Sequence, residues 1–184
     1  MNSEENKSNL VKVDIDIQEF KDIIKDITEN SSVLSLKEHV QHMKSSRYEH
    51  CYEVAYYTYV LSKKLGLDYI SATRGAMLHD FYFYDWRNKG VEGQKHFHAY
   101  RHPRIALNNA TENFELNEVE KDILMKHMWP LTIIPPKSIE GFIVTLADKI
   151  ATYKETTKYI KEKCKESKPY RYAYLFILFV IKKI

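Results

Sequence analysis

The chain of 184 residues is poor in residues that interrupt regular secondary structure, with five glycines and five prolines. Glycine and proline mark turns and destabilise helix interiors, whereas the lysine, glutamate, leucine, isoleucine and alanine that abound here favour helices. The length suggests one domain that is large enough to bury a proper hydrophobic core. Composition therefore predicts an all-α protein.

Cysteine is also scarce, and the two that are present, Cys51 and Cys164, are far apart and lack C-x-x-C spacing. This pattern argues against a disulfide framework and favours a cytoplasmic protein. The N-terminal residues are polar and acidic, and they lack the positively charged segment and apolar run of a signal peptide. Cys51 follows His50 and would be placed to act as a soft metal ligand, but we favour a small buried apolar residue there.

The chain lacks a strong charge of either sign, since its formal net charge is +3 at pH 7. That charge is too small to indicate a nucleic-acid partner, and no basic patch alternates with aromatic residues. The uncharged segment Tyr172–Ile181 has ten residues. As a helix it would span about 15 Å, half of a bilayer core. We therefore expect no nucleic-acid partner and no transmembrane span. We expect this segment to pack in the core or to form a homodimer contact, and we rank both above an anchor at a membrane interface.

Apolar residues recur with helical periodicity along most of the chain, and cap residues separate the periodic segments. Ser35 and Glu38 have the spacing of a capping box, Gly66 is expected at a helix C-terminus, and Pro103 is expected at a first helical position. The predicted helices are 16–28, 35–43, 47–65, 69–80, 103–110, 118–127 and a long one from 139 onward. The inward stripe of the 47–65 helix is expected to contain Val54, Tyr57, Val60, Leu61 and Leu65.

A histidine and an aspartate stand next to each other at His79-Asp80, where the apolar 69–80 helix ends. Side chains of helical neighbours point about 100° apart, so both can reach one cation between them. His50 precedes Val54 by four residues and is expected on the inward face of its helix. Asp148 has apolar neighbours, and a buried carboxylate without a partner is costly. Together these four residues would form one site of mixed nitrogen and oxygen ligands, which suits Mn, Fe, Ni, Co or Zn.

Two further histidines, His102 and His127, would complete a second metal site with Asp80 as the bridge. Two metals about 3.5–4 Å apart can clamp a phosphate and generate a hydroxide nucleophile at neutral pH. Each of these residues taken alone has a plainer interpretation, such as a hydrogen-bonded core histidine or a surface carboxylate. The metal prediction rests on their combination.

The order His50, His79-Asp80, His102, His127, Asp148 resembles that of the HD-domain phosphohydrolase superfamily. The surrounding motifs agree, with an arginine three residues before His50, a Gly-Ala-Met-Leu-His-Asp stretch at 75–80 and an Ala-Asp-Lys stretch at 147–149. The resemblance covers roughly residues 33–160 and implies an HD-type helical bundle. It also implies that one metal is held by His50, His79, Asp80 and Asp148, and that His102 and His127 belong to a binuclear site.

Within that superfamily the chain is similar to uncharacterised bacterial HD proteins with a His-Met-Trp-Pro-Leu-Thr stretch, here at 127–132, and more distantly to symmetrical diadenosine tetraphosphate hydrolases. It departs from the HD-GYP phosphodiesterases, because Trp129-Pro130-Leu131 replaces their Gly-Tyr-Pro loop and Phe83 replaces a lysine. Cyclic-di-GMP is therefore not the expected substrate. We divide the chain into an N-terminal extension with one helix (1–32), an HD domain (33–168) and an apolar C-terminal tail (169–184).

These observations predict a metal-dependent phosphohydrolase that cleaves a nucleotide or another small phosphoester or phosphoanhydride through a metal-bound hydroxide. The expected cofactor is a pair of divalent transition-metal ions, with Fe or Mn favoured over Zn, Ni or Co. The predicted catalytic residues are Asp80, His79, Arg47 and Lys149. The predicted substrate-binding residues are Arg47, His98, Arg101 and Arg104, each of which has a solvated surface group as its plainer interpretation.

Two other functions remain open at this point. The chain would also suit a non-catalytic module that binds a nucleotide or metal in signalling, although an intact ligand set argues against it. The same six ligands would serve a di-iron oxygenase of HD type, in which the metal pair activates oxygen.

Overall fold

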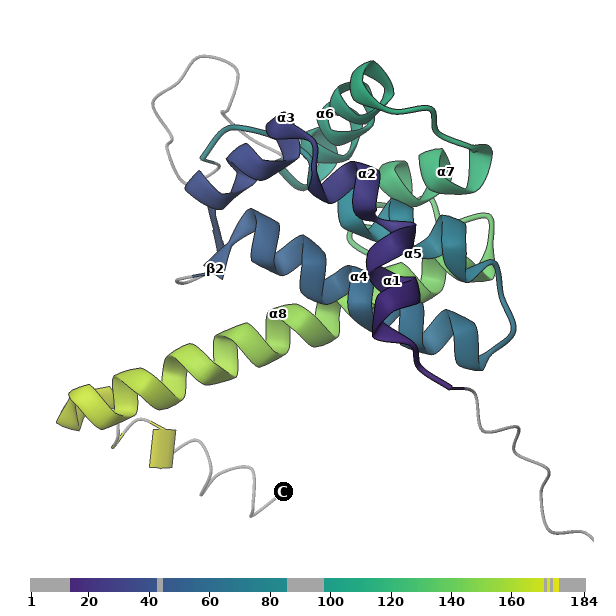
Figure 1. Ribbon diagram of the computed structural model, residues 1–184. Helices are drawn as coiled ribbons and strands as arrows, with labels where there is room; N and C mark the ends of the chain where they lie inside the picture. The colour runs from purple at the N-terminus through teal and green to yellow at the C-terminus, as the bar shows by residue number, and fades with distance from the viewer. Residues whose placement is uncertain (1–13, 43–44, 86–97, 171, 173, 176–184) are drawn as a thin grey trace, which may run out of the picture.

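The computed structural model describes residues 14–42, 45–85, 98–170, 172 and 174–175 (Figure 1). These residues are mainly helical, which confirms the predicted all-α class. The elements before the central helices are α1 (Ile17–Ile23), α2 (Lys25–Thr28), α3 (Ser31–Leu34), the 3-10 helix η1 (Ser35–Glu38), β1 (Val40–His42) and β2 (Ser45–Ser46). The longer helices follow as α4 (Arg47–Lys64), α5 (Tyr69–Leu78), α6 (His98–Asn113), α7 (Glu118–Lys126) and α8 (Ile139–Glu166).

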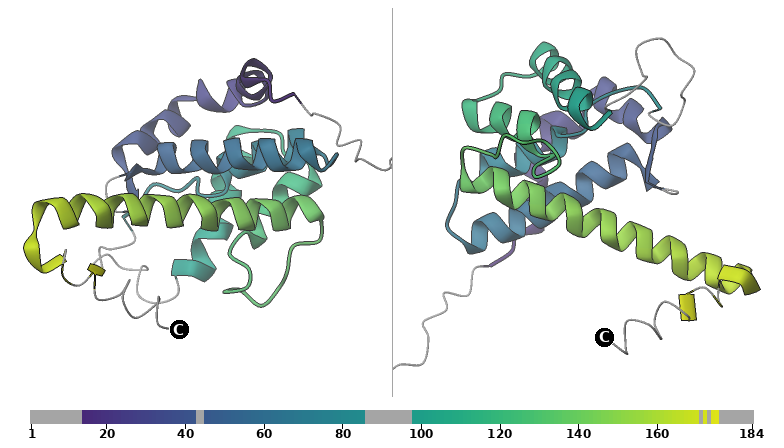
Figure 2. Two further views of the ribbon diagram at one scale, coloured as in Figure 1. Left: turned by 90° about the horizontal axis from the view of Figure 1, so that it is seen from below. Right: turned by 180° about the vertical axis from the view of Figure 1, so that it is seen from behind.

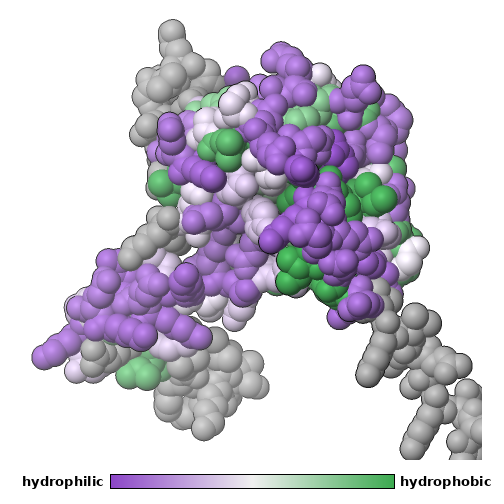
Figure 3. All heavy atoms as spheres, in the orientation of Figure 1, coloured by the Kyte–Doolittle hydropathy of each residue, from purple (hydrophilic) through white to green (hydrophobic). Residues whose placement is uncertain are grey.

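Helix α4 occupies the middle of the bundle, where it packs against both α5 and α8. Helices α4 and α8 run side by side, α7 packs on α5 and α8, and α6 packs on α7 (Figure 2). The C-terminal half of α8 extends beyond the bundle as an arm (Figures 1 and 2). On the face shown in Figure 3 this arm is covered mainly with hydrophilic residues. No helix within the described residues is long and apolar enough to cross a membrane.

Side chains at the helix ends satisfy the backbone groups that a helix leaves unpaired. Ser46 and Glu49 form a capping box at the start of α4, and Asn117 and Glu120 form another at the start of α7. Asp68 accepts a hydrogen bond from the Ser71 amide at the start of α5. The predicted C-terminal glycine, Gly66, has a φ of 67°, a left-handed conformation that favours glycine after a helix.

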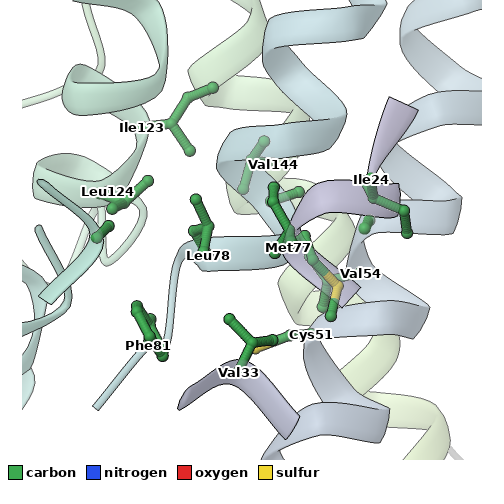
Figure 4. Packing of buried hydrophobic residues seen from close by; sticks show 14 of the residues in the cluster. Ile24, Val33, Cys51, Val54, Met77, Leu78, Phe81, Ile123, Leu124 and Val144 are labelled. Carbon is green, nitrogen blue, oxygen red and sulfur yellow. The ribbon is translucent and has the colours of Figure 1, made fainter. Parts of the chain in front are cut away.

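The hydrophobic core is shared by η1 and by all the helices from α1 to α8, and residues of α5 lie at its centre (Figure 4). Met77 and Leu78 are fully buried there, immediately before His79. Phe20, Ile24 and Ile27 belong to the same core, although they precede residue 33. The core thus draws on both sides of the domain boundary proposed after residue 32, and that boundary stays a prediction. The apolar tail from residue 169 falls largely outside the described residues.

The predicted helix over residues 35–43 is wrong beyond Glu38. His39 has extended backbone, with φ −102° and ψ 118°, and its carbonyl oxygen accepts a hydrogen bond from the Arg47 amide at 2.7 Å. The chain then forms β1, which pairs antiparallel with β2. This short hairpin replaces the last helical turn and brings Gln41 to Asp80, a long-range contact that local periodicity does not encode.

Two other local predictions need correction. Pro103 lies inside α6 rather than at its first position, because α6 already begins at His98. The buried face of α4 is also not the expected apolar stripe, since Leu65 is 59% exposed. Helix α4 contacts both α5 and α8, so its buried surface is wider than one stripe and includes small and polar residues. The buried residues of α4 are Arg47, His50, Cys51, Val54, Ala55, Thr58, Tyr59 and Ser62.

We predict that Phe20→Ala will lower the free energy of unfolding by about 3–5 kcal/mol, the usual cost of removing a buried phenylalanine. The Phe20 ring is 1% exposed and lies 5.3 Å and 5.4 Å, centroid to centroid, from Tyr52 and Tyr56 of α4. Urea unfolding should remain a single transition with a lower midpoint. The exposed Ile17→Ala serves as the control and should change the free energy by less than about 0.5 kcal/mol. An equally small effect of Phe20→Ala would mean that α1 is not part of the core.

Candidate metal centre

The Asp80 carboxylate lies at the centre of a buried cluster of histidines, just beyond the end of α5. Its Oδ1 is 3.2 Å from Nε2 of His102 and 3.7 Å from Nε2 of His127. Its Oδ2 is 3.6 Å from Nε2 of His79. Two sets of three buried residues therefore share Asp80: His50, His79 and Asp80 in one, and Asp80, His102 and His127 in the other. Within each set the ligand atoms lie within 4.8 Å of one another.

Asp148 approaches the first set from α8. Its Oδ1 lies 3.1 Å from Nε2 of His50 and 3.9 Å from Nε2 of His79. The structure thus brings together all six side chains that the sequence proposed as metal ligands, from α4, α6, α8 and the ends of α5 and α7. Their role as ligands stays a prediction.

The ends of α5 and α7 orient two of the histidines. Nδ1 of His79 lies 2.7 Å from the Ala76 carbonyl oxygen, and Nδ1 of His127 lies 2.9 Å from the Leu124 carbonyl oxygen. The last carbonyl groups of a helix have no partner within it, so a histidine just past the end can donate to the carbonyl three residues back. In the neutral ring with Nδ1 as the donor, Nε2 faces Asp80 with its lone pair, the tautomer that a metal ligand requires. Burial would lower the pKa of His79, but Asp80 outweighs this effect and raises it to about 9, so this ring must lose a proton before it binds metal.

Glu155 orients His50, as the helix-end carbonyl groups orient His79 and His127. The sequence did not predict this role for Glu155. Its Oε1 lies 3.2 Å from Nδ1 of His50, while Nε2 of the same ring faces Asp148. A carboxylate behind a histidine ligand fixes the orientation of the ring and raises its basicity. Glu155 follows Asp148 by seven residues, which places both on one face of α8. That spacing is the feature of the sequence that could have indicated a role for Glu155 beside Asp148.

The residues present fit a pair of divalent transition-metal ions. His79 Nε2 and Asp80 Oδ1 are buried and make no hydrogen bond with any described residue. Asp80 Oδ1 lies close to the ring nitrogens of His102 and His127 without an aligned hydrogen bond. A buried polar atom without a hydrogen bond costs free energy, and a bound cation would satisfy both atoms. Mixed imidazole and carboxylate donors suit transition metals better than Mg²⁺ or Ca²⁺, which prefer oxygen alone.

The charges of the cluster shift the pKa values of its members in opposite directions. Burial opposes ionisation of Asp80, but the surrounding histidines, His79 foremost, hold the pKa of its carboxyl group well below the usual range. Burial would lower the pKa of His50, but its contacts with Asp148 and Glu155 raise it to about 10. Burial together with the neighbouring histidines lowers the pKa of His127 to about 3. His127 is therefore neutral at pH 7, as a metal ligand must be.

Gln41, which the sequence analysis also missed, connects this cluster to Arg47. Its Nε2 donates a hydrogen bond to Oδ2 of Asp80. Its Oε1 accepts hydrogen bonds from Nε of Arg47 at 2.7 Å and from the Tyr82 hydroxyl at 3.1 Å. An isolated glutamine in a short strand carries no sequence signal for such a role.

The predicted role of Arg47 in substrate binding does not fit its surroundings. Arg47 is fully buried, and its guanidinium lies 3.6 Å from the centre of the Tyr82 ring. Nη1 donates to the Tyr82 carbonyl at 2.6 Å, and Nη2 donates to the Tyr84 carbonyl at 3.2 Å. A side chain held inside the protein in this way cannot reach a substrate. We propose instead that Arg47 positions Gln41 and the segment that follows Asp80.

The other predicted cations differ in their surroundings. Nζ of Lys149 donates to the carbonyl oxygens of Trp129 and Thr145 at 2.9 Å and 3.3 Å. Arg101 and Arg104 are exposed on α6, and neither is among the described residues that line the cleft at the metal centre. The side chain of His98 lies outside the described part of the structure. Substrate contacts by these residues stay predictions.

A cleft of about 520 Å³ opens onto the metal centre, large enough for a small organic ligand. Asp80, His102, His127 and Asp148 lie at one side of it. The remaining described residues that line the cleft are Gln41, Met128, Trp129, Pro130, Leu131, Lys149, Thr152 and Tyr153. The cluster of proposed ligands is therefore accessible to a small molecule through this cleft.

Comparison with known families supports the resemblance derived from the sequence. A family model described as the HD domain matches residues 47–153. The match covers more than half of the chain and includes all six of the proposed ligands. Searches of curated proteins and of solved structures found no match.

We predict that Glu155→Gln will weaken metal binding about 10–100-fold, the usual effect of losing a carboxylate behind a histidine ligand. Titration of chelator-treated protein with Mn²⁺ in a calorimeter would measure this. Glu162→Gln, on the same helix but two turns further along, is the matched control and should bind Mn²⁺ like the wild type. Unchanged affinity in Glu155→Gln would show that His50 needs no such support.

Metal affinity should also rise with pH. The raised pKa of His50, about 10, means that this ring carries an additional proton at pH 7 before metal binds. That proton must leave on binding, so affinity should increase about tenfold per pH unit for each proton displaced, from pH 6 to 8. Calorimetry in two buffers of different ionisation enthalpy would count the released protons. A pH-independent affinity with no proton release would contradict the prediction.

Proposed function

This chain belongs to the HD-domain family, and from that premise we propose that it is a metal-dependent hydrolase of a small phosphoester. The observation that supports the proposal most strongly is the position of Asp80, which is shared by two buried sets of potential ligands. We assign His50, His79, Asp80 and Asp148 to one ion and Asp80, His102 and His127 to the other. Iron and manganese are the favoured ions. The cytoplasmic location and the homodimer contact through the tail stay predictions.

The reaction that we propose is the hydrolysis of a phosphorus–oxygen ester bond. When bound, two such cations neutralise charge on the phosphoryl oxygens and lower the pKa of a coordinated water. Oxygen from water forms the new bond to phosphorus, and the bond to the leaving oxygen breaks. The products are inorganic phosphate and an alcohol, so the leaving oxygen must receive a proton.

We assign the supply of that proton to Lys149. Two of its hydrogen bonds go to backbone carbonyls, which hold Nζ at the edge of the cleft. Burial lowers the pKa of Lys149, despite the opposing effect of Asp148, and thereby makes its proton easier to donate. Gln41 meanwhile holds Asp80 through its hydrogen bond to Oδ2. In this assignment Asp80 and Lys149 are catalytic residues, His79 is a ligand, and Arg47 and Gln41 are positioning residues.

We predict that Asp80→Asn will lower phosphatase activity by at least about 100-fold, because it removes the charge shared by both ligand sets while keeping the side chain's shape. The assay uses Mn²⁺-loaded and Fe²⁺-loaded protein with p-nitrophenyl phosphate and with nucleoside monophosphates, which belong to the nucleotide class that the sequence predicts. Asp22→Asn, exposed on α1, is the control and should retain full activity.

The same samples separate the other two functions. Oxygen uptake by the iron-loaded wild type, with no phosphate release, would indicate an oxygenase. Metal binding with neither activity would indicate a binding module. Full phosphatase activity in Asp80→Asn would contradict the proposed mechanism.

A further inference from the structure

One wall of the cleft at the proposed metal centre is apolar. It consists of Met128, Trp129, Pro130 and Leu131, which follow α7, and Tyr153 of α8. The cleft, at about 520 Å³, is far larger than one phosphoryl group needs. Its remaining space therefore lies against carbon-rich side chains. Apolar walls with a few polar groups at one end are typical of sites for small organic ligands.

Contacts from two helices hold this wall in place. The Trp129 ring packs edge-on against Phe142 of α8, with ring centroids 5.3 Å apart. Lys149 binds the Trp129 carbonyl at 2.9 Å. The Tyr100 hydroxyl, from α6, donates to the Leu131 carbonyl at 2.9 Å. The wall is thus fixed before any ligand binds, which lowers the entropic cost of binding.

The part of the cleft lining that the structure describes presents few polar groups to a sugar or a base. Among the described residues that line it outside the proposed ligands, Gln41 is committed to Asp80 and Arg47, and Lys149 binds two carbonyls. Thr152 Oγ1 lies 3.5 Å from Oδ1 of Asp148. Lys149 is the single cation among these lining residues, so a chain of several phosphates would find little to neutralise it there.

We propose that the substrate is a phosphomonoester of an apolar alcohol, whose phosphoryl group lies at the metal centre and whose alkyl or aromatic part lies against the wall. This inference rests on the proposed function and narrows it, since it places apolar phosphomonoesters ahead of nucleotides. Leu131 and Tyr153 are 58% and 70% exposed at the mouth of the cleft, so the apolar surface continues outward and suits an extended group.

The first test measures binding without turnover. Alkylphosphonates from methyl to octyl carry a similar headgroup on a bond that a phosphoesterase does not hydrolyse. Each buried methylene should lower Kd about fourfold. Trp129 reports binding by fluorescence in Mn²⁺-loaded Trp86→Phe protein, since the chain has two tryptophans. The same Kd for methylphosphonate and octylphosphonate would overturn the inference.

A pair of variants tests whether the alkyl chain binds against the apolar wall. Leu131→Ser should flatten the dependence of Kd on chain length, because it replaces an apolar side chain of the wall with a polar one. Ile133→Ser, whose side chain is 86% exposed and lies outside the described lining, should keep the full dependence. Equal dependence in both variants would place the alkyl chain elsewhere and overturn the assignment.

Turnover then separates this inference from the proposed function. We expect kcat/KM to rise from methyl to octyl phosphate and to exceed the value for nucleoside 5′-monophosphates. Chain-length-dependent binding without hydrolysis of any phosphate would contradict the hydrolase and leave the apolar site intact. Hydrolysis that prefers nucleotides, with binding independent of chain length, would overturn the apolar site and leave the hydrolase intact.

Discussion

The structure depends on a carboxylate, Asp80, that is buried among histidines. An isolated buried carboxylate would be protonated, because burial penalises the charged form. Here the surrounding imidazoles hold its pKa well below the usual range, so it stays ionised. Its two oxygens face different histidines, with His102 and His127 near Oδ1 and His79 near Oδ2. The same arrangement that keeps the charge stable inside the protein creates two adjoining sets of metal donors.

The helical bundle supplies these donors mainly through helix ends and one long helix. Termination of α5 and α7 leaves carbonyl groups that orient His79 and His127. Helix α8 carries Asp148 and, seven residues later, Glu155, so one helix face both contributes a donor and supports His50. The segment after α7 then turns across α8 and forms the apolar wall of the cleft. The ends of α5 and α7 therefore shape both the helical bundle and the cluster of proposed metal donors.

The sequence predicted the helical class and several caps, and it singled out the six side chains that the structure brings together, because these depend on local periodicity and on the order of residues along the chain; their role as metal donors stays a prediction. It did not predict the contacts that join distant segments. The hairpin that brings Gln41 to Asp80 replaced a predicted helical turn, and the burial of Arg47 depends on carbonyls more than thirty residues away. Tertiary contacts override local preference at such places. The seven-residue spacing between Asp148 and Glu155 is visible in the sequence, but it indicates a role for Glu155 only when the position of His50 in the fold is known.

The measurement that tests this account most directly is metal content by mass spectrometry for the wild type, His127→Ala and His39→Ala, each purified without chelator. His39 is half-buried and absent from both ligand sets, so its variant controls for loss of a histidine. The account predicts two ions per chain in the wild type and in His39→Ala, and one in His127→Ala. Equal metal content in wild type and His127→Ala, or none in any sample after reloading with Mn²⁺ or Fe²⁺, would contradict it.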